Sequence, residues 1–124
     1  MSTALNTQEQ KIETALMDLK TLLGKGQFME AMHKYLADDV VLQEANQTPK
    51  VGKETCLIAE EALLDTVTEF IRYDIFDYAI NGDTSFYEAI MEFKTNDGKH
   101  HKFEQVNRTK WRDGKIINER YFHQ

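Results

Sequence analysis

The sequence predicts an α+β domain: three N-terminal helices and a short strand packed on the concave face of a curved, four-stranded antiparallel meander. The meander is indicated by three turn signals, Asn81-Gly82, Asp97-Gly98 and Asp113-Gly114, each 16 residues after the last. Gly after Asn or Asp favours a hairpin, because these residues tolerate positive φ where the chain reverses. The runs between the turns, from Glu69 to Gln124, are rich in Tyr, Phe, Ile, Val and Thr, as strands are. Before Glu69, apolar residues recur at helical spacing, so this part of the chain is expected to cover one face of the sheet.

The first helix is expected to have Thr7 as its capping residue and to end at a pair of glycines. Thr7 and Gln10 have the spacing of a capping box. Gly24 and Gly26 are typical of the end of a helix. Between these signals, four apolar residues share one helical face: Ile12, Leu16, Leu19 and Leu23.

A second, shorter helix and a short strand are predicted next. The helix ends near Asp38-Asp39, and Val40 to Glu44 then forms the strand. The apolar residues that predict the helix are Phe28, Met32, Tyr35 and Leu36. In the strand, Val40, Leu42 and Glu44 share one face.

A loop and a third helix complete the N-terminal half. The loop, Asn46 to Gly52, contains the only proline, and the helix is expected from Lys53 to Thr68. Its apolar residues are Leu57, Ile58, Ala62 and Leu64. Its acidic residues are expected to be solvated: Glu54, Glu60, Glu61 and Asp65.

Length, charge and cysteine content narrow the class of protein. A chain of 124 residues is expected to form one domain with its own core, and 41% hydrophobic and 29% charged residues are ordinary for a globular protein. The formal net charge of -6 argues against nucleic acid or an anionic membrane as a partner. A single cysteine, Cys56, excludes an internal disulfide and a cysteine zinc cluster. The sequence shows no signal peptide, membrane span or glycine-rich phosphate loop, so we expect a cytoplasmic protein without a cofactor.

No metal site is expected either. His100 and His101 are adjacent on a predicted strand, so their side chains point to opposite faces and do not readily share one metal ion. Glu30 and His33 form a single Glu-x-x-His unit, whereas carboxylate metal sites of that kind need two such units and further carboxylates.

Strand alternation predicts which side chains face the helices. From His100 to Arg112 the even positions are mostly charged, whereas the odd positions mix aromatic and uncharged polar residues. A two-residue hairpin loop would pair odd with even positions and mix the faces, but three-residue loops at Asn96–Gly98 and Arg112–Gly114 keep them matched. The pairs that these loops predict are Met91 with Phe103, Tyr87 with Asn107, Asn107 with Glu119 and Gln105 with Tyr121.

The predicted inner face is unusually polar for one that only packs against helices. Its two central rows are Tyr87–Asn107–Glu119 and Ala89–Gln105–Tyr121. A buried polar group costs about 1–3 kcal/mol when it is left without a partner, so such groups pair with one another, line water or contact a ligand. Polar groups that converge in an aromatic-lined concavity are typical of a small-molecule site.

The order helix, helix, strand, helix and meander resembles the nuclear transport factor 2-like superfamily, which includes ketosteroid isomerases and SnoaL-like polyketide cyclases. The resemblance covers nearly the whole chain and rests on three segments: Tyr35-Leu36-Ala37-Asp38-Asp39-Val40-Val41, Val51-Gly52-Lys53-Glu54 and Trp111-Arg112-Asp113-Gly114-Lys115-Ile116. It implies a cone-shaped, cystatin-like fold. Because this fold hosts enzymes, binders and assembly modules, it does not by itself imply one function.

The resemblance to ketosteroid isomerases also implies roles for single residues. Glu44 occupies the position similar to the aspartate general base, and Asn107, four residues before Trp111, the position similar to an oxyanion-hole aspartic acid. The position similar to the oxyanion-hole tyrosine carries Leu19. One of three catalytic roles is thus kept in kind, which argues against steroid isomerisation and leaves proton transfer on another substrate open.

Each of these residues also has a structural interpretation. Glu44 is either a general base or a solvated carboxylate at the strand end. Asn107 either donates a hydrogen bond to an oxyanion or is a structural amide bonded to Tyr87 or Glu119. Glu119 is either a second acid or base or an exposed residue at the cone mouth, and the exposed position is the more common for a glutamate.

We therefore expect a protein that binds a small, partly apolar molecule in a cone-shaped pocket. The expected ligand-binding residues are Tyr35, Tyr87, Met91, Phe103, Gln105, Trp111, Glu119 and Tyr121. One alternative is a cofactor-independent isomerase, cyclase or dehydratase that uses Glu44 as its base, with Asn107 as a donor. A second alternative is a non-catalytic, dimeric interaction module.

The outer face of the sheet is expected to form a homodimer interface. Lys102, Arg108, Lys110 and Arg112 lie there with Glu88, Glu92 and Glu104, which predicts cross-strand ion pairs. Ile90, Val106, Ile116 and Phe122 are also predicted on this face. An apolar centre with a charged rim suits a subunit interface.

Overall fold

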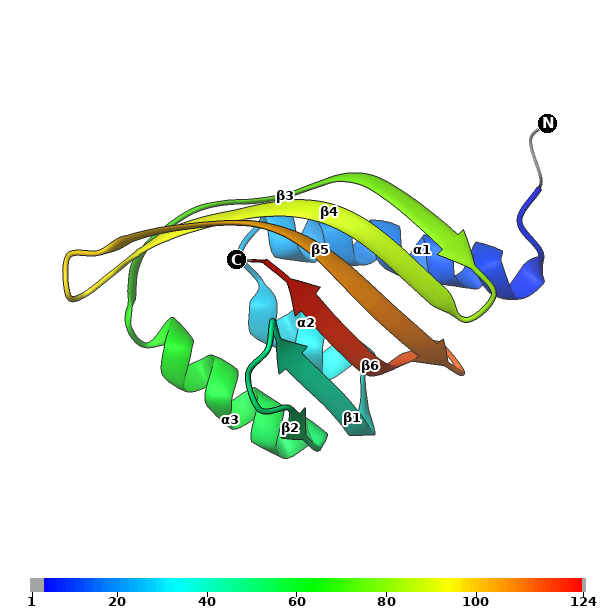
Figure 1. Ribbon diagram of the computed structural model, residues 1–124, viewed down its shortest axis with the longest axis horizontal. Helices are drawn as coiled ribbons and strands as arrows, with labels where there is room; N and C mark the ends of the chain where they lie inside the picture. The colour runs from blue at the N-terminus through cyan, green and yellow to red at the C-terminus, as the bar shows by residue number, and fades with distance from the viewer. Residues whose placement is uncertain (1–3, 124) are drawn as a thin grey trace.

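A computed structural model describes residues 4–123 of the chain. Three helices and six strands follow one another in the order α1, α2, β1, β2, α3, β3, β4, β5, β6 (Figure 1). Their bounds are Thr7–Gly24 (α1), Phe28–Tyr35 (α2), Leu36–Glu44 (β1), Lys50–Val51 (β2), Lys53–Leu64 (α3), Val67–Asn81 (β3), Thr84–Thr95 (β4), His100–Arg112 (β5) and Lys115–Phe122 (β6). Among the described residues, no helix is both long and apolar enough to span a membrane.

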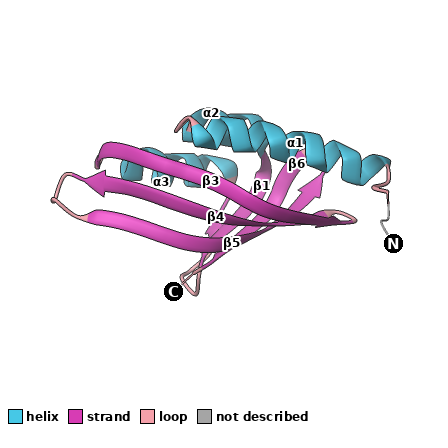
Figure 2. Ribbon diagram, turned by 90° about the horizontal axis from the view of Figure 1, so that it is seen from above, coloured by secondary structure: helices cyan, strands magenta, loops and turns pink. Residues whose placement is uncertain are grey.

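All six strands form one curved sheet in the order β2-β1-β6-β5-β4-β3. Figure 2 shows the three helices on the same side of this sheet, which confirms the predicted α+β architecture. The core lies between the two layers, where Leu16 of α1 and Val40 of β1 are completely buried. The predicted meander is β3 to β6, and the strand that precedes it, β1, pairs in parallel with β6.

The first helix begins one residue earlier than its sequence signal predicted. The capping residue is Asn6, whose side chain accepts a hydrogen bond from the Glu9 amide at 2.8 Å, while the Glu9 carboxylate accepts from the Asn6 amide at 3.0 Å. The predicted Thr7–Gln10 box is therefore wrong, and Thr7 is the first helical residue. The second oxygen of Glu9 accepts from the Gly82 amide at 2.9 Å, so the same carboxylate ties α1 to the β3–β4 turn.

The second helix ends three residues earlier than predicted, and a strand follows it without a loop. Tyr35 is the last helical residue, and Leu36 already has an extended conformation. The reason is non-local: β1 pairs with β6, beginning with Leu36 opposite Ile116. The predicted loop from Asn46 to Gly52 contains the two-residue strand β2, which pairs with β1.

The third helix ends at Leu64, four residues before the predicted end. The Thr66 hydroxyl donates to the Leu63 carbonyl at 2.6 Å, and Val67 then pairs with Thr95 as the first residue of β3. The predicted apolar face also differs, because Ile58 is 63% exposed whereas Cys56 is buried.

The β4–β5 hairpin has the predicted register. A three-residue loop with Gly98 at φ +81° connects the strands, and both Met91–Phe103 and Tyr87–Asn107 are paired as expected. His100 and His101 point to opposite faces: His100 contacts Glu92 on the outer face, and His101 lines the inner one.

The β5–β6 register differs from the prediction by two residues. The connection is a two-residue turn in which Asp113 and Gly114 both have positive φ, at 51° and 76°. Pairing then skips Ile117, and this β-bulge returns odd positions to the inner face. The predicted pairs of Asn107 with Glu119 and of Gln105 with Tyr121 are wrong, because Asn107 pairs with Tyr121 and Thr109 with Glu119.

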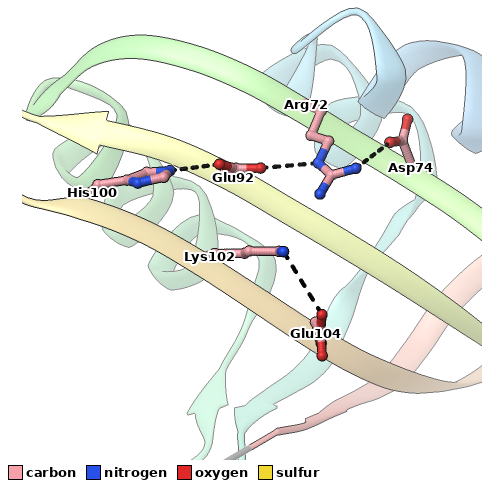
Figure 3. A network of polar contacts seen from close by, with 6 residues as sticks. All are labelled: Arg72, Asp74, Glu92, His100, Lys102 and Glu104. Atoms are coloured by element: carbon pink, nitrogen blue, oxygen red, sulfur yellow. Dashed lines mark hydrogen bonds and ion pairs between the residues drawn. The ribbon is translucent and has the colours of Figure 1, made fainter.

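The outer face of the sheet carries the expected charge network, although not with every expected pair. Glu92 contacts Arg72 of β3 at 3.0 Å and His100 of β5 at 2.6 Å, and Lys102 lies 3.9 Å from Glu104 in its own strand (Figure 3). These contacts are partly or fully exposed, and exposed pairs typically contribute about 0–1 kcal/mol each. The network therefore shapes the charge of this face more than it stabilises the fold.

Candidate functional site

A cavity of about 480 Å³ lies between the helices and the concave face of the sheet. This volume is in the range of about 300–1,000 Å³ that is usual for sites of drug-sized ligands. The wall is mostly apolar, with side chains from all three helices and all the long strands. Its polar residues are Glu44, Gln47, Lys50, Glu60, Tyr73, Tyr87, Thr95, His101, Gln105, Glu119, Tyr121 and His123.

Two tyrosines and a glutamine of this wall form a buried cluster with Asn107, which lies behind them. The hydroxyls of Tyr73 on β3 and Tyr87 on β4 are 3.1 Å apart. Asn107 Nδ2 donates to both hydroxyls, at 3.2 Å and 2.7 Å, and Gln105 Nε2 donates to that of Tyr73 at 3.3 Å. Burial is the main cause that raises the pKa of both tyrosines, so both remain neutral phenols.

The orientation of the Asn107 amide follows from the partners around it. With the nitrogen toward the tyrosines, only the acceptor Oδ1 is left buried without a partner. The opposite assignment would leave an NH₂ group with two donors unpaired, which is the more costly arrangement. Asn107 is completely buried and lies behind the hydroxyls rather than in the cavity wall, so it acts on a ligand only through Tyr73 and Tyr87.

Glu119 is a buried carboxyl in the cavity wall, not the exposed residue that its charge suggested. It is 8% exposed, and its two oxygens accept from Thr109 at 2.5 Å and from Tyr121 at 2.6 Å. Burial raises the pKa of Glu119, against the lowering effect of these two hydrogen bonds, and the charge of Glu44 raises it further. The bulge at Ile117 aims this side chain at Thr109 instead of Asn107.

Two more carboxylates line the cavity near β1 and α3. Glu44 Oε2 lies 2.8 Å from His123 Nε2, and its side chain is 42% exposed. Glu60, expected to be solvated, is half-buried, and its pKa is raised by burial and by the charge of Glu44. Lys50 opposes this effect, since its positive charge lowers the pKa of Glu60.

The residues predicted for the site divide into two groups. The structure brings seven of them into the cavity wall: Glu44, Tyr87, Met91, Phe103, Gln105, Glu119 and Tyr121. Asn107, Tyr35 and Trp111 lie outside the wall. Tyr35 instead donates to Asp18 and packs edge-on against Trp111, whose Nε1 donates to Ser85.

Sequence reasoning missed Tyr73, Glu60 and the contribution of His101. Tyr73 lies on β3, whose register shifts three times against β4, so simple alternation does not place its side chain. Glu60 is hidden by an acidic run on a helix with a weak apolar stripe. His101 did carry a signal, because it occupies an odd position in the strand whose odd positions face inward.

Solved structures share this architecture. Two are candidate SnoaL-like polyketide cyclases. The one from Mesorhizobium loti has 23% identity and a TM-score of 0.78, and the match covers 90% of this chain and 97% of that one. The one from Jannaschia sp. CCS1 has 13% identity and a TM-score of 0.84, and the match covers 99% of this chain and 92% of that one. A third is a LEH-like epoxide hydrolase from M. tuberculosis, with 15% identity and a TM-score of 0.78; the match covers 94% of this chain and 84% of that one. No protein-family model and no curated protein matches the chain.

These likenesses define the fold of the chain. The chain has the nuclear transport factor 2-like fold in the form seen in SnoaL-like proteins, as the resemblance in sequence predicted. At these identities the comparison establishes the fold, and the function must be argued from the cavity itself.

Proposed function

We propose that this protein binds a small, partly apolar molecule with a carbonyl or hydroxyl group inside the cone. The observation that carries the proposal is the cavity of about 480 Å³, which the side chains of an aromatic and polar inner face leave unfilled. If the polar residues of the inner face had only a structural role, we would expect the side chains around them to be closely packed, as in an ordinary protein core. The wall instead offers apolar surface for the body of a ligand and phenol groups for its oxygen.

A blocked cavity tests this proposal. Ala59 of α3 lines the cavity, whereas Ala62 on the same helix is exposed and does not. We expect Ala59→Trp to abolish binding and Ala62→Trp to leave it unchanged, in ligand-observed NMR with a panel of biphenyl and naphthyl ketones and phenols. The proposal is wrong if no panel member binds the wild-type protein, or if Ala59→Trp binds as well as Ala62→Trp.

A second candidate function is proton transfer on the bound molecule, with Glu44 as the base. Glu44 lines the cavity, and the contact with His123 at 2.8 Å holds its carboxylate there. Epoxide hydrolase activity belongs to one structural neighbour by name, so a hydrolase or isomerase is compatible with this fold. For any ligand found, Glu44→Gln should lose turnover and retain binding; unchanged turnover would exclude Glu44 as the base.

We further propose that the protein forms a homodimer through the outer face of the sheet. Phe86, Val106 and Phe122, on β4, β5 and β6, are all more than 40% exposed on the face away from the helices. Val106 pairs directly with Phe122, and the Arg120 guanidinium lies 4.7 Å from the Phe122 ring. An exposed apolar strip with a charged rim is the usual composition of a subunit interface.

A further inference from the structure

The end of the cavity near the β4–β5 hairpin holds a histidine in a fixed orientation. The His101 imidazole stacks on Phe93 at 4.9 Å between ring centroids and lies nearly parallel to Phe103, at an interplanar angle of 8°. All three residues line the cavity. The ring plane is therefore set by its neighbours before any ligand binds.

A chain of hydrogen bonds also fixes the proton on this ring. The Thr95 hydroxyl donates its only proton to Asp97 Oδ1 at 2.6 Å, and the same oxygen accepts from the Lys99 amide at 3.1 Å. These bonds lower the pKa of Asp97, so it is an ionised acceptor at neutral pH. Thr95 Oγ1 can then only accept from His101 Nε2, which lies 3.0 Å away.

The other ring nitrogen of His101 consequently offers an unused acceptor. When Nε2 carries the proton, Nδ1 of the neutral imidazole has a lone pair. Within residues 4–123 this nitrogen makes no hydrogen bond, and the side chain faces the cavity. A ligand group that donates a hydrogen bond is the partner this position lacks.

The tyrosine cluster, by contrast, has a hydrogen-bond donor without an acceptor. Tyr73 and Tyr87 together carry two phenolic protons, and their mutual hydrogen bond uses one. The amides of Gln105 and Asn107 only donate to these hydroxyls, so no acceptor in the described part of the chain takes the second proton. The cluster therefore offers one unused donor in the cavity wall.

These two positions lie well apart along the sheet. Gln105, which binds the tyrosine cluster, precedes Asn107 on β5 and follows His101 by four residues. Four residues of strand span about 13 Å. We therefore expect a ligand that reaches both positions to be elongated.

We infer that the cavity selects an elongated ligand that donates a hydrogen bond to His101 at the hairpin end and accepts one from the Tyr73–Tyr87 pair at the other. The inference rests on the proposed binding function and adds to it the class of ligand: a flat, partly apolar molecule with a hydroxyl or NH group at one end and a carbonyl at the other. Thr95 and Asp97 are positioning residues in this arrangement, since they act only through the imidazole.

Three biphenyl ketones test the inference. 4-Acetyl-4′-hydroxybiphenyl has the acceptor and the donor, the 4′-methoxy compound lacks the donor, and 4-acetylbiphenyl controls for size. We expect isothermal titration calorimetry to give at least tenfold tighter binding of the hydroxy compound to the wild-type protein. The ratio should fall to about one in His101→Phe, which keeps the aromatic stack, and should remain in His100→Phe, which alters the outer face.

Two further measurements test whether the tautomer of His101 determines the binding ratio. In the unmutated protein, ¹⁵N NMR should show neutral His101 as the Nε2–H tautomer, with an Nδ1 shift that only the hydroxy compound changes. Thr95→Val should remove the tautomer preference and the binding ratio together. Equal affinities in the wild-type protein, no binding of any of the three compounds, or a ratio retained in His101→Phe would each overturn the inference. The binding function itself is decided separately, by the wider panel and the Ala59→Trp variant.

Discussion

Asn107 shows how a buried polar residue acts on a site that it does not touch. Its amide nitrogen holds two tyrosine hydroxyls within 3.2 Å, while its oxygen is buried without a partner. An unpaired buried acceptor costs about 1–3 kcal/mol, so the fold is less stable here than an apolar core would make it. In return, Asn107 fixes the positions of the Tyr73 and Tyr87 hydroxyls. Asn107 therefore contributes to ligand recognition indirectly, by orienting these two groups.

Glu119 should make stability depend on pH in a definite direction. Burial holds its pKa above that of the unfolded chain, where the pKa of a glutamate is about 4.3. As the pH rises above this value, the unfolded state loses its proton first, the native state binds more protons, and the free energy of unfolding falls. Each unit of difference between the two pKa values is worth about 1.4 kcal/mol. Glu119→Gln has no such proton to lose, so its stability relative to wild type should increase between pH 4 and pH 7.5.

Thermal unfolding at these two pH values measures the effect. The melting temperature of Glu119→Gln minus that of wild type should rise by several degrees between them, since about 1 kcal/mol corresponds to a few degrees in a domain of this size. Glu60, whose pKa is also raised, contributes equally to both proteins and cancels. Glu61→Gln, at an exposed position of α3, should show no such change between the two pH values. A constant difference for Glu119→Gln would mean that burial does not raise the pKa of this carboxyl.

At the scale of elements, what could be predicted depended on how local the determining contacts were. The β4–β5 register followed from one turn signal and alternation, because both are local. The β5–β6 register did not, because alternation requires only that odd residues pair with odd ones. A bulge at Ile117 meets that requirement as well as a longer loop does. The inner face was therefore predictable, whereas the partner of Glu119 across the sheet was not.

The first turn of α1 offers a direct test of its observed boundary. Asn6→Ala removes the oxygen that accepts from the Glu9 amide, and loss of such a cap typically costs about 1 kcal/mol. Thr7→Ala changes an exposed residue inside the helix, where alanine has the higher helix propensity, and should be neutral or slightly stabilising. The free energies of unfolding of both variants, measured in urea, show whether Asn6 or Thr7 is the capping residue. A larger loss of stability in Thr7→Ala would restore Thr7 as the cap.

At the scale of the whole molecule, the cavity exists because the helices cover the concave face of a curved sheet without filling it. β1 pairs with β6, and α1 packs on β3 at the far side of the sheet. The β4–β5 hairpin extends beyond α3 at one end (Figure 1). No local pattern encodes the space that remains between these layers. The sequence could show that the inner face was polar, but not that Glu60 of α3 would share a cavity with it.

The outer face of the same sheet leads to the prediction about assembly. If two copies pair through the strip of Phe86, Val106 and Phe122, sedimentation should give twice the 14.5 kDa mass of the chain. Val106→Glu would place a second carboxylate opposite Glu88 at the centre of this strip and should weaken the dimer at least tenfold, or about 1.4 kcal/mol.

Ile58→Glu is the matched control, because Ile58 is 63% exposed on α3 and lies away from the sheet face. It should leave the dimer intact. The cavity opens on the opposite side of the sheet, so Val106→Glu should also keep the affinity for biphenyl ketones even as a monomer. A wild-type protein that sediments as a monomer at all concentrations, or equal dissociation of the dimer by both substitutions, would rule out this interface.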